Sequence, residues 1–204
     1  VQREYTLPLR MLVVADPTGD LPGAYREGLE IRDSLTHLDE VVEVDIATSD
    51  VDFAYVVDQL KSYDIFHYAG HSDYEDGDRG QWGWRLADRH LTEEDVRHLF
   101  GSAPLPHLVV ANTCRTSMES QEAFTERAAA YISRAFLVSG ASHYVDTLWE
   151  VPDRPGATFA VALYDRLIRG EALGVAVAEG RQALARHFGE EALAWASYIL
   201  YGSP

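Results

Sequence analysis

Cysteine and histidine together can supply a nucleophile and its base, and this sequence offers one such pairing. Cys114 is the only cysteine among the 204 residues, and it follows the apolar run 108–112. His71 follows a shorter apolar and aromatic run, 65–69, with Gly70 between them. An imidazole can take the proton of a thiol or hold the thiolate as an ion pair, and the thiolate is the attacking form. Cys114 and His71 are therefore candidates for nucleophilic catalysis.

Both residue types also have plainer roles. A single cysteine behind an apolar strand is more often a small buried side chain than a nucleophile. His67 lies inside the run 65–69, where we expect a packed, hydrogen-bonded histidine. Five further histidines have no strand-end glycine beside them, and we interpret them as surface or structural residues: His90, His98, His107, His143 and His187.

The elements that must position these residues alternate along the chain. Six segments read as strands, most of them unbroken apolar runs: 9–15, 41–46, 65–69, 105–112, 142–149 and 195–201. Segments with helical spacing of apolar residues lie between them, and Thr92 followed by three acids is typical of a helix start. Unbroken apolar strands separated by helices indicate helices on both faces of a parallel sheet. We predict an α/β fold, a three-layer α/β/α sandwich with a mostly parallel sheet of about six strands.

In an open α/β sheet, ligands bind at the carboxyl ends of the strands. The segments to consider are therefore 70–72, 113–115 and 149–153. Residues 72–81 are polar and contain glycine, so we expect a loop there. The segment 82–91, with two tryptophans, predicts a small hairpin or an irregular flap that either walls a substrate groove or belongs to the core.

Composition narrows the class of protein. The formal net charge is −16, and an acidic surface repels phosphate backbones, so we expect neither nucleic acid nor membrane as a partner. One cysteine allows no internal disulfide and no structural zinc site. No apolar run approaches about 18 residues, and the first residues lack a signal pattern. We expect a cytoplasmic protein and, because the sequence begins with Val1, one domain spanning 1–204 that is cut from a longer chain.

Five segments in order resemble CHAT domains, relatives of caspases and separases that are often joined to tetratricopeptide repeats. The two that hold the candidate pair are HYAGHSD (67–73) and VVANTCRTS (109–117). The other three follow them in the chain: ISRAFLVSGASHYVDTLWEVPD (132–153), LYDRLIRGEALGVAVAEGRQAL (163–184) and WASYILYGSP (195–204). Residues before about 60 fit by pattern alone.

The resemblance implies a caspase-like fold and a cysteine peptidase whose catalytic dyad is His71 and Cys114. The two are 43 positions apart, near the roughly 50 expected for caspases. It also implies an oxyanion hole made by the backbone amides of Ser72 and Cys114. The family often has glycine at position 72, glutamate at 115 and glycine at 117, where this chain has Ser72, Arg115 and Ser117. A serine keeps the backbone N–H, and the charge of Arg115 would favour the thiolate.

The resemblance also implies a pocket for the residue before the cut. Asn112, two positions before the cysteine, is expected to line it. In separases a segment similar to LWEVPD supplies an acid that receives arginine; here that acid is Asp153, with Glu150 and Asp146 close in sequence. A carboxylate binds a guanidinium through paired hydrogen bonds, so we expect cleavage after arginine or lysine of protein or peptide substrates. Alternatively, Asp153 only caps the helix after Pro152.

Two other functions compete with the peptidase. One is a catalytically silent caspase-like scaffold or signalling module, against which the presence of both dyad residues argues. The other is a small-ligand-binding domain, but residues 16–20 form no phosphate-cradling glycine motif. The acidic run after His71 (Asp73, Glu75, Asp76 and Asp78) fits no calcium loop, so we expect solvated acids, with no metal and no cofactor. For a peptidase, we expect control by a partner domain, such as tetratricopeptide repeats, or by loops 72–90 and 115–123.

Overall fold

A computed structural model describes residues 6–75, 81–99, 104–115, 132–149 and 151–202. Its centre is a sheet whose main path runs in the order β2-β1-β3-β6-β7-β8. The first five strands on this path are parallel and β8 is antiparallel to β7. The strands are β1 (Leu9–Ala15), β2 (Val42–Thr48), β3 (Ile65–Glu75), β6 (Leu108–Arg115), β7 (His143–Thr147) and β8 (Tyr198–Tyr201).

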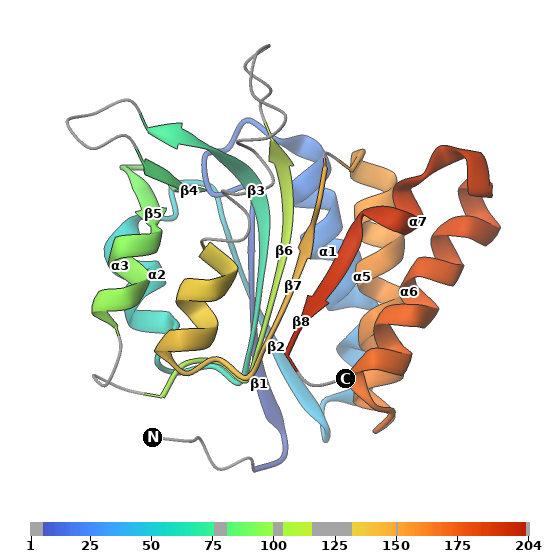
Figure 1. Ribbon diagram of the computed structural model, residues 1–204. Helices are drawn as coiled ribbons and strands as arrows, with labels where there is room; N and C mark the ends of the chain where they lie inside the picture. Colours follow the sequence, from blue (N-terminus) through green and yellow to red (C-terminus); the bar gives the residue numbers. More distant parts are fainter. Residues whose placement is uncertain (1–5, 76–80, 100–103, 116–131, 150, 203–204) are drawn as a thin grey trace.

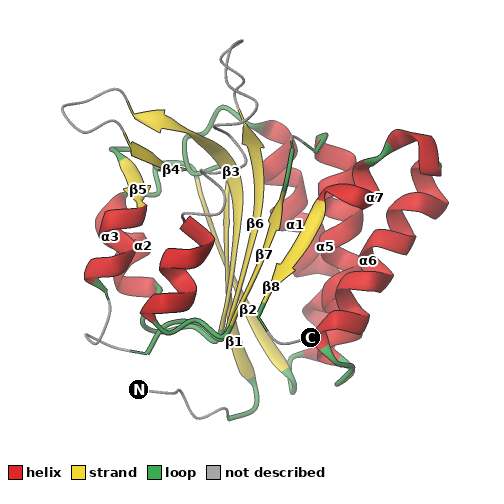
Figure 2. Ribbon diagram, in the orientation of Figure 1, coloured by secondary structure: helices red, strands yellow, loops and turns green. Residues whose placement is uncertain are grey.

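Helices cover both faces of this sheet (Figures 1 and 2). One face carries α1 (Pro22–Leu35), α5 (Asp153–Ile168) and α6 (Leu173–Phe188). The other carries α2 (Phe53–Gln59), α3 (Glu93–His98) and a helix over 132–139. The predicted three-layer α/β/α sandwich with a mostly parallel sheet is confirmed. Three shorter helices complete the described elements: η1 (Thr36–Leu38), η2 (Glu190–Ala192) and α7 (Ala194–Ser197).

Strand β1 shows why the central strands read as unbroken apolar runs. Met11, Val13 and Ala15 pack into the core beneath α1, α5 and α6, whereas Leu12 and Val14 pack into the core on the opposite face. All five are fully buried. A strand that is covered on both faces has no solvent side on which polar residues could alternate.

Strand β3 is longer than the apolar run predicts. Its last residues, Ser72–Glu75, pair antiparallel with β4 (Gln81–Arg85), which in turn pairs with β5 (His90–Thr92). The prediction of a loop over 72–81 is therefore wrong for residues 72–75 and 81, which belong to strands. This extension projects beyond the main sheet, so its pairing comes from backbone hydrogen bonds and needs no apolar sequence signal.

The segment 82–91 was predicted as a hairpin or an irregular flap. It contains all of β4 but its first residue and the start of β5, and these two strands pair antiparallel. Trp84 is fully buried and stacks on Tyr68, with ring centroids 4.5 Å apart, and on Phe136 at 5.1 Å. Of the two roles considered for this segment, Trp84 serves the core.

Two helix predictions can be compared with the structure. Thr92 caps α3 as predicted: its hydroxyl accepts from the Asp95 amide, and the Asp95 carboxylate accepts from the Thr92 amide in return. The spacing of apolar residues from Phe124 to Ala135 predicts a helix that ends near Gly140; residues 124–131 lie outside the described residues, and 132–139 are helical. The strand predicted at 195–201 begins only at Tyr198, because α7 forms a helical turn before it.

Candidate active site

Strands β3 and β6 bring the backbone positions of the candidate dyad together. In their parallel register His71 pairs with Cys114, and Ser72 pairs with Arg115. Neighbouring strands lie about 4.8 Å apart, so the histidine and cysteine positions are adjacent across the sheet. The side chain of Cys114 lies outside the described part of the structure.

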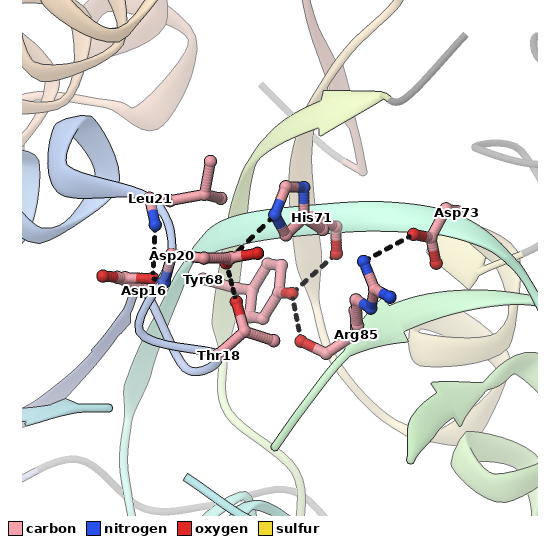
Figure 3. Close-up of polar contacts among 8 residues, drawn as sticks. All are labelled: Asp16, Thr18, Asp20, Leu21, Tyr68, His71, Asp73 and Arg85. Atoms are coloured by element: carbon pink, nitrogen blue, oxygen red, sulfur yellow. Dashed lines mark hydrogen bonds and ion pairs between the residues drawn. The ribbon is translucent and has the colours of Figure 1, made fainter. Parts of the chain in front are cut away.

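The imidazole of His71 is nearly enclosed and is held from one side (Figure 3). Its side chain is 11% exposed, and Nε2 lies 3.2 Å from Oδ1 of Asp20. Because a carboxylate can only accept, this contact places the ring proton on Nε2. Nδ1 is buried and has no hydrogen-bond partner among the described residues. A neutral imidazole in this tautomer therefore presents the lone pair of Nδ1 as a base.

Asp20 is a site residue that the sequence did not reveal. Its carboxylate also accepts from the hydroxyl of Thr18. This hydrogen bond, together with the charge and hydrogen bond of His71, outweighs the opposing effect of burial and holds the pKa of Asp20 below its usual range. An ionised carboxylate at this place orients the imidazole and stabilises its protonated form.

The loop that carries Asp20 is shaped by Asp16, which follows directly after β1. One oxygen of its carboxylate accepts the backbone N–H groups of Asp20 and Leu21, both at 2.9 Å. Asp16 and Gly19 both have positive φ, 52° and 77°. In the sequence, Asp16-Pro17-Thr18-Gly19 predicts only a turn. An aspartate directly after a central strand was the available signal, since strand ends in such sheets are where polar site residues gather.

Tyr68 contacts the backbone at His71 through its hydroxyl group. Its hydroxyl lies 2.7 Å from the carbonyl oxygen of His71 and 2.8 Å from that of Arg85, and its single proton can be donated to either. Gly70 permits this approach, because a Cβ at that position would meet the Tyr68 hydroxyl at 2.7 Å. The glycine beside the candidate histidine is thus explained by close packing.

A charged cluster continues along β3 beyond His71. Asp73 contacts His90 and forms an ion pair with Arg85 at 3.5 Å. Burial acts to raise the pKa of Asp73, but the hydrogen bond from His90 and the charges of His90 and Arg85 outweigh it and hold the pKa below its usual range. His90, which the sequence analysis assigned to surface or structural histidines, joins β5 to the strand that carries His71.

A recess lies beside the dyad, between α1, α5 and the carboxyl end of β6. Its described lining is Ala24, Glu27, Gly70, Asn112, Thr113, Val151, Pro152 and Gly156. Asn112 was expected in a pocket, and it lines this one. Glu27 was not expected, because a glutamate within a helix carries no signal that it faces a site.

Glu27 and Asn112 belong to a buried polar network. Oε1 of Glu27 accepts from Nε2 of His67 at 2.8 Å and from Nδ2 of Asn112 at 2.5 Å. Nδ1 of His67 lies 2.9 Å from the hydroxyl of Tyr164, whose pKa is raised well above its usual value by burial and by the charge of Glu27. His67 is fully buried, so the prediction of a packed, hydrogen-bonded histidine is confirmed.

The three acids that the sequence favoured as partners of a basic substrate residue are found in different places. Asp146 is buried on β7, where one of its carboxylate oxygens accepts the Thr147 amide at 2.8 Å, and it is not among the described residues that line the recess. Asp153 is the first residue of α5, and Pro152 holds the N-cap position that the alternative gave to Asp153. Glu150 lies outside the described residues.

The remaining histidines are dispersed. His107 and His143 meet edge to face at the opposite end of the sheet, with ring centroids 4.7 Å apart, and burial with the charge of His143 lowers the pKa of His107. His98 is exposed on α3, and His187 contacts the carbonyl oxygen of Ala183 in α6. In the described parts of the chain, no three His, Cys, Asp or Glu residues are grouped to hold a metal ion. The described helices are also too short or too polar to cross a membrane.

The architecture is that of caspase-like proteins. Separase of Saccharomyces cerevisiae, solved with securin, superposes with a TM-score of 0.62 at 16% identity, over 98% of this chain and 12% of separase. The Arg-specific cysteine proteinase gingipain R superposes with a TM-score of 0.68 at 13% identity, over 96% of this chain and 46% of gingipain. The chain thus spans about an eighth of separase and less than half of gingipain R. At these identities the likeness establishes the fold.

The sequence itself identifies the family. Residues 2–203 match the CHAT domain, so the chain belongs to the CHAT domain family. No curated protein sequence matches it significantly. The expected family and the caspase-like fold are both confirmed.

Proposed function

We propose that this chain is a cysteine endopeptidase that cleaves protein substrates with a dyad of His71 and Cys114. One observation carries the proposal. His71 is nearly buried, one of its ring nitrogens lies against Asp20, the other has no hydrogen-bond partner among the described residues, and its register partner on the adjacent strand is the only cysteine of the chain. A base with a free lone pair beside a thiol is the arrangement that nucleophilic catalysis requires.

The proposed reaction has two stages. Nδ1 of His71 takes the thiol proton of Cys114, and the thiolate attacks the scissile carbonyl carbon. The tetrahedral oxyanion is stabilised by the backbone amides of Ser72 and Cys114. The C–N bond then breaks as the imidazolium returns its proton to the departing amine, leaving a thioester on Cys114. In the second stage His71 deprotonates a water molecule that hydrolyses the thioester and restores the thiol.

We propose a preference for a basic residue before the cut. The net charge of −16 and the carboxylates near the dyad favour cationic peptides. The gingipain that shares this fold is described as Arg-specific. Candidate substrate-binding residues are Asn112 and Glu27, which line the recess. The sequence-predicted acids Asp146, Glu150 and Asp153 are the alternatives to Glu27 as the acid that receives the basic residue.

The proposal extends to the setting of the enzyme. We place it in the cytoplasm, as one peptidase domain over 1–204 of a longer protein, controlled by a partner domain such as tetratricopeptide repeats. Separase, which shares the fold, was solved in complex with securin. This chain matches only part of separase. A peptidase in the cytoplasm needs such restraint.

The dyad is tested by cleavage of a mixed-sequence peptide library and by the rate of Cys114 alkylation with iodoacetamide. Cys114→Ala and His71→Ala should each abolish cleavage, and their effects should not add, because the two residues act as a unit. His71→Ala should also slow alkylation at neutral pH, since the thiolate loses its partner. The exposed His98→Ala is the matched control. Cleavage by Cys114→Ala at the wild-type rate would refute the dyad, whereas a wild-type chain that cleaves no peptide of the library would favour the silent scaffold.

A further inference from the structure

We propose that the recess between α1 and α5 holds the substrate side chain that precedes the scissile bond, and that Glu27 is the acid that receives its cationic head. The inference rests on the proposed peptidase function and names the substrate class of that site. It assigns recognition to a helix residue rather than to the LWEVPD segment.

The recess adjoins the dyad from two strands. Asn112 and Thr113 line it and are the two residues that precede Cys114 in β6. Gly70 also lines it and directly precedes His71 in β3. A peptide whose carbonyl lies between the two dyad positions therefore has the recess within reach of a neighbouring side chain.

The orientation of the Asn112 amide leaves an acceptor free. Nδ2 contacts Oε1 of Glu27 at 2.5 Å and the carbonyl oxygen of Gly156 at 3.2 Å. Both partners are acceptors, so the amide nitrogen must face them and Oδ1 must point away. Asn112 is 9% exposed, and its Oδ1 is buried with no hydrogen-bond partner among the described residues. A buried acceptor without a donor is costly, which favours an occupant that supplies one.

Glu27 offers a second acceptor. Glu27 is 4% exposed, and its Oε1 already accepts hydrogen bonds from His67 and Asn112. No described residue donates to Oε2, which lies against Gly156: a Cβ built on that glycine would be 2.8 Å from Oε2 and 3.4 Å from Nδ2 of Asn112. Gly156 is therefore the position that leaves both side chains reachable from the recess.

Two acceptors without a donor among the described residues, one of them an oxygen of the Glu27 carboxylate, select the chemistry of the occupant. Arginine and lysine side chains carry only donors, and the fork of a guanidinium suits two neighbouring oxygens. An acidic side chain would meet like charge and find no donor, and an apolar one would leave both acceptors unpaired. Of the acids considered, Glu27 is the one among the described lining residues.

The test uses peptidyl acyloxymethyl ketones, which alkylate the cysteine and differ only in the residue before the reactive carbon: arginine, lysine, norleucine or glutamate. The wild-type chain should label about 100-fold faster with arginine than with norleucine, because a site built for hydrogen bonds rejects an analogue that lacks them. Glu27→Gln should lower the arginine rate by about 30-fold or more while the norleucine rate changes less than about threefold.

Three further variants sharpen the assignment. Gly156→Ala keeps the Glu27 carboxylate but fills the space in front of it, so it should slow arginine and lysine probes even if Glu27→Gln folds poorly. Glu30→Gln removes the same charge from an exposed position of α1 and should leave all rates unchanged. Asp153→Asn tests the acid that the sequence favoured and should preserve the preference for arginine.

The outcomes separate the two proposals. Labelling of Cys114 with an arginine preference that survives Glu27→Gln and Gly156→Ala would overturn the Glu27 pocket and leave the peptidase intact. Loss of the preference in Asp153→Asn alone would return recognition to the LWEVPD segment. If no probe labels Cys114 and His71→Ala does not alter alkylation by iodoacetamide, the peptidase proposal fails and the pocket fails with it.

Discussion

The two nitrogens of His71 have different surroundings, and this difference defines the site. Nε2 donates a hydrogen bond to Asp20, whereas Nδ1 is buried without a hydrogen-bond partner among the described residues. The carboxylate does not touch the reacting atoms in this arrangement, so Asp20 is a positioning residue. It fixes the tautomer and the ring orientation and stabilises the imidazolium that forms when the thiol is deprotonated.

Replacing Asp20 tests this positioning role. Asp20→Asn should lower kcat/KM for peptide cleavage by about 10- to 100-fold, because the imidazolium loses its counter-charge and the amide can hold the wrong tautomer. Alkylation of Cys114 by iodoacetamide should slow as well, because the amide no longer stabilises the imidazolium that pairs with the thiolate. Asp39→Asn, an exposed aspartate, is the control. An unchanged alkylation rate would assign Asp20 a purely structural role.

At this scale the sequence could indicate only part of the site. Cys114 and His71 are recognisable because each follows an apolar run that predicts a buried strand, and chain order places those strands close together. Asp20 and Glu27 are not recognisable in this way, because their nearness to the site depends on how the loop after β1 and the helix α1 pack against β3 and β6. No local sequence pattern indicates that Asp20 or Glu27 packs close to the site.

The elements themselves follow more directly from the sequence. Unbroken apolar runs locate the buried strands, and the acids after Thr92 locate the start of α3. The antiparallel extension of β3 could not be predicted from polarity, since Ser72 and Asp73 resemble loop residues and their pairing with β4 is made by the backbone. Resemblance to CHAT domains added the family, which periodicity alone does not provide.

The cap of α3 yields a prediction at the scale of the element. Thr92→Ala should lower the free energy of unfolding by about 1 kcal/mol, because the Asp95 amide loses its acceptor at the helix start. Thr158→Ala, in the interior of α5, is the control and should not destabilise, since alanine favours helix interiors. Denaturant unfolding measures both. Equal stability of Thr92→Ala and wild type would show that the capping box contributes nothing.

At the scale of the whole molecule, several carboxylates tie pH to stability. The pKa values of Asp20, Asp73, Asp95 and Asp165 all lie below their usual range in the folded chain. For Asp95, burial opposes the shift, but hydrogen bonds from Arg89 and Thr92 outweigh it. A carboxylate whose pKa is lower in the folded than in the unfolded chain stabilises the fold above the unfolded value, about 3.9, and this contribution disappears as the pH falls through the folded value.

Stability should therefore fall steeply below about pH 4, even though protonation relieves the repulsion within a chain of net charge −16. Asp95→Asn isolates one contribution. Its loss of unfolding free energy relative to wild type should be largest at pH 7 and should shrink below about pH 4, where the carboxylate of the unfolded wild-type chain becomes protonated. Asp39→Asn, exposed and without these partners, should show no such trend. Denaturant unfolding from pH 3 to pH 7 gives the comparison, and a difference for Asp95→Asn that stays constant with pH would mean that charge at this carboxylate does not stabilise the fold.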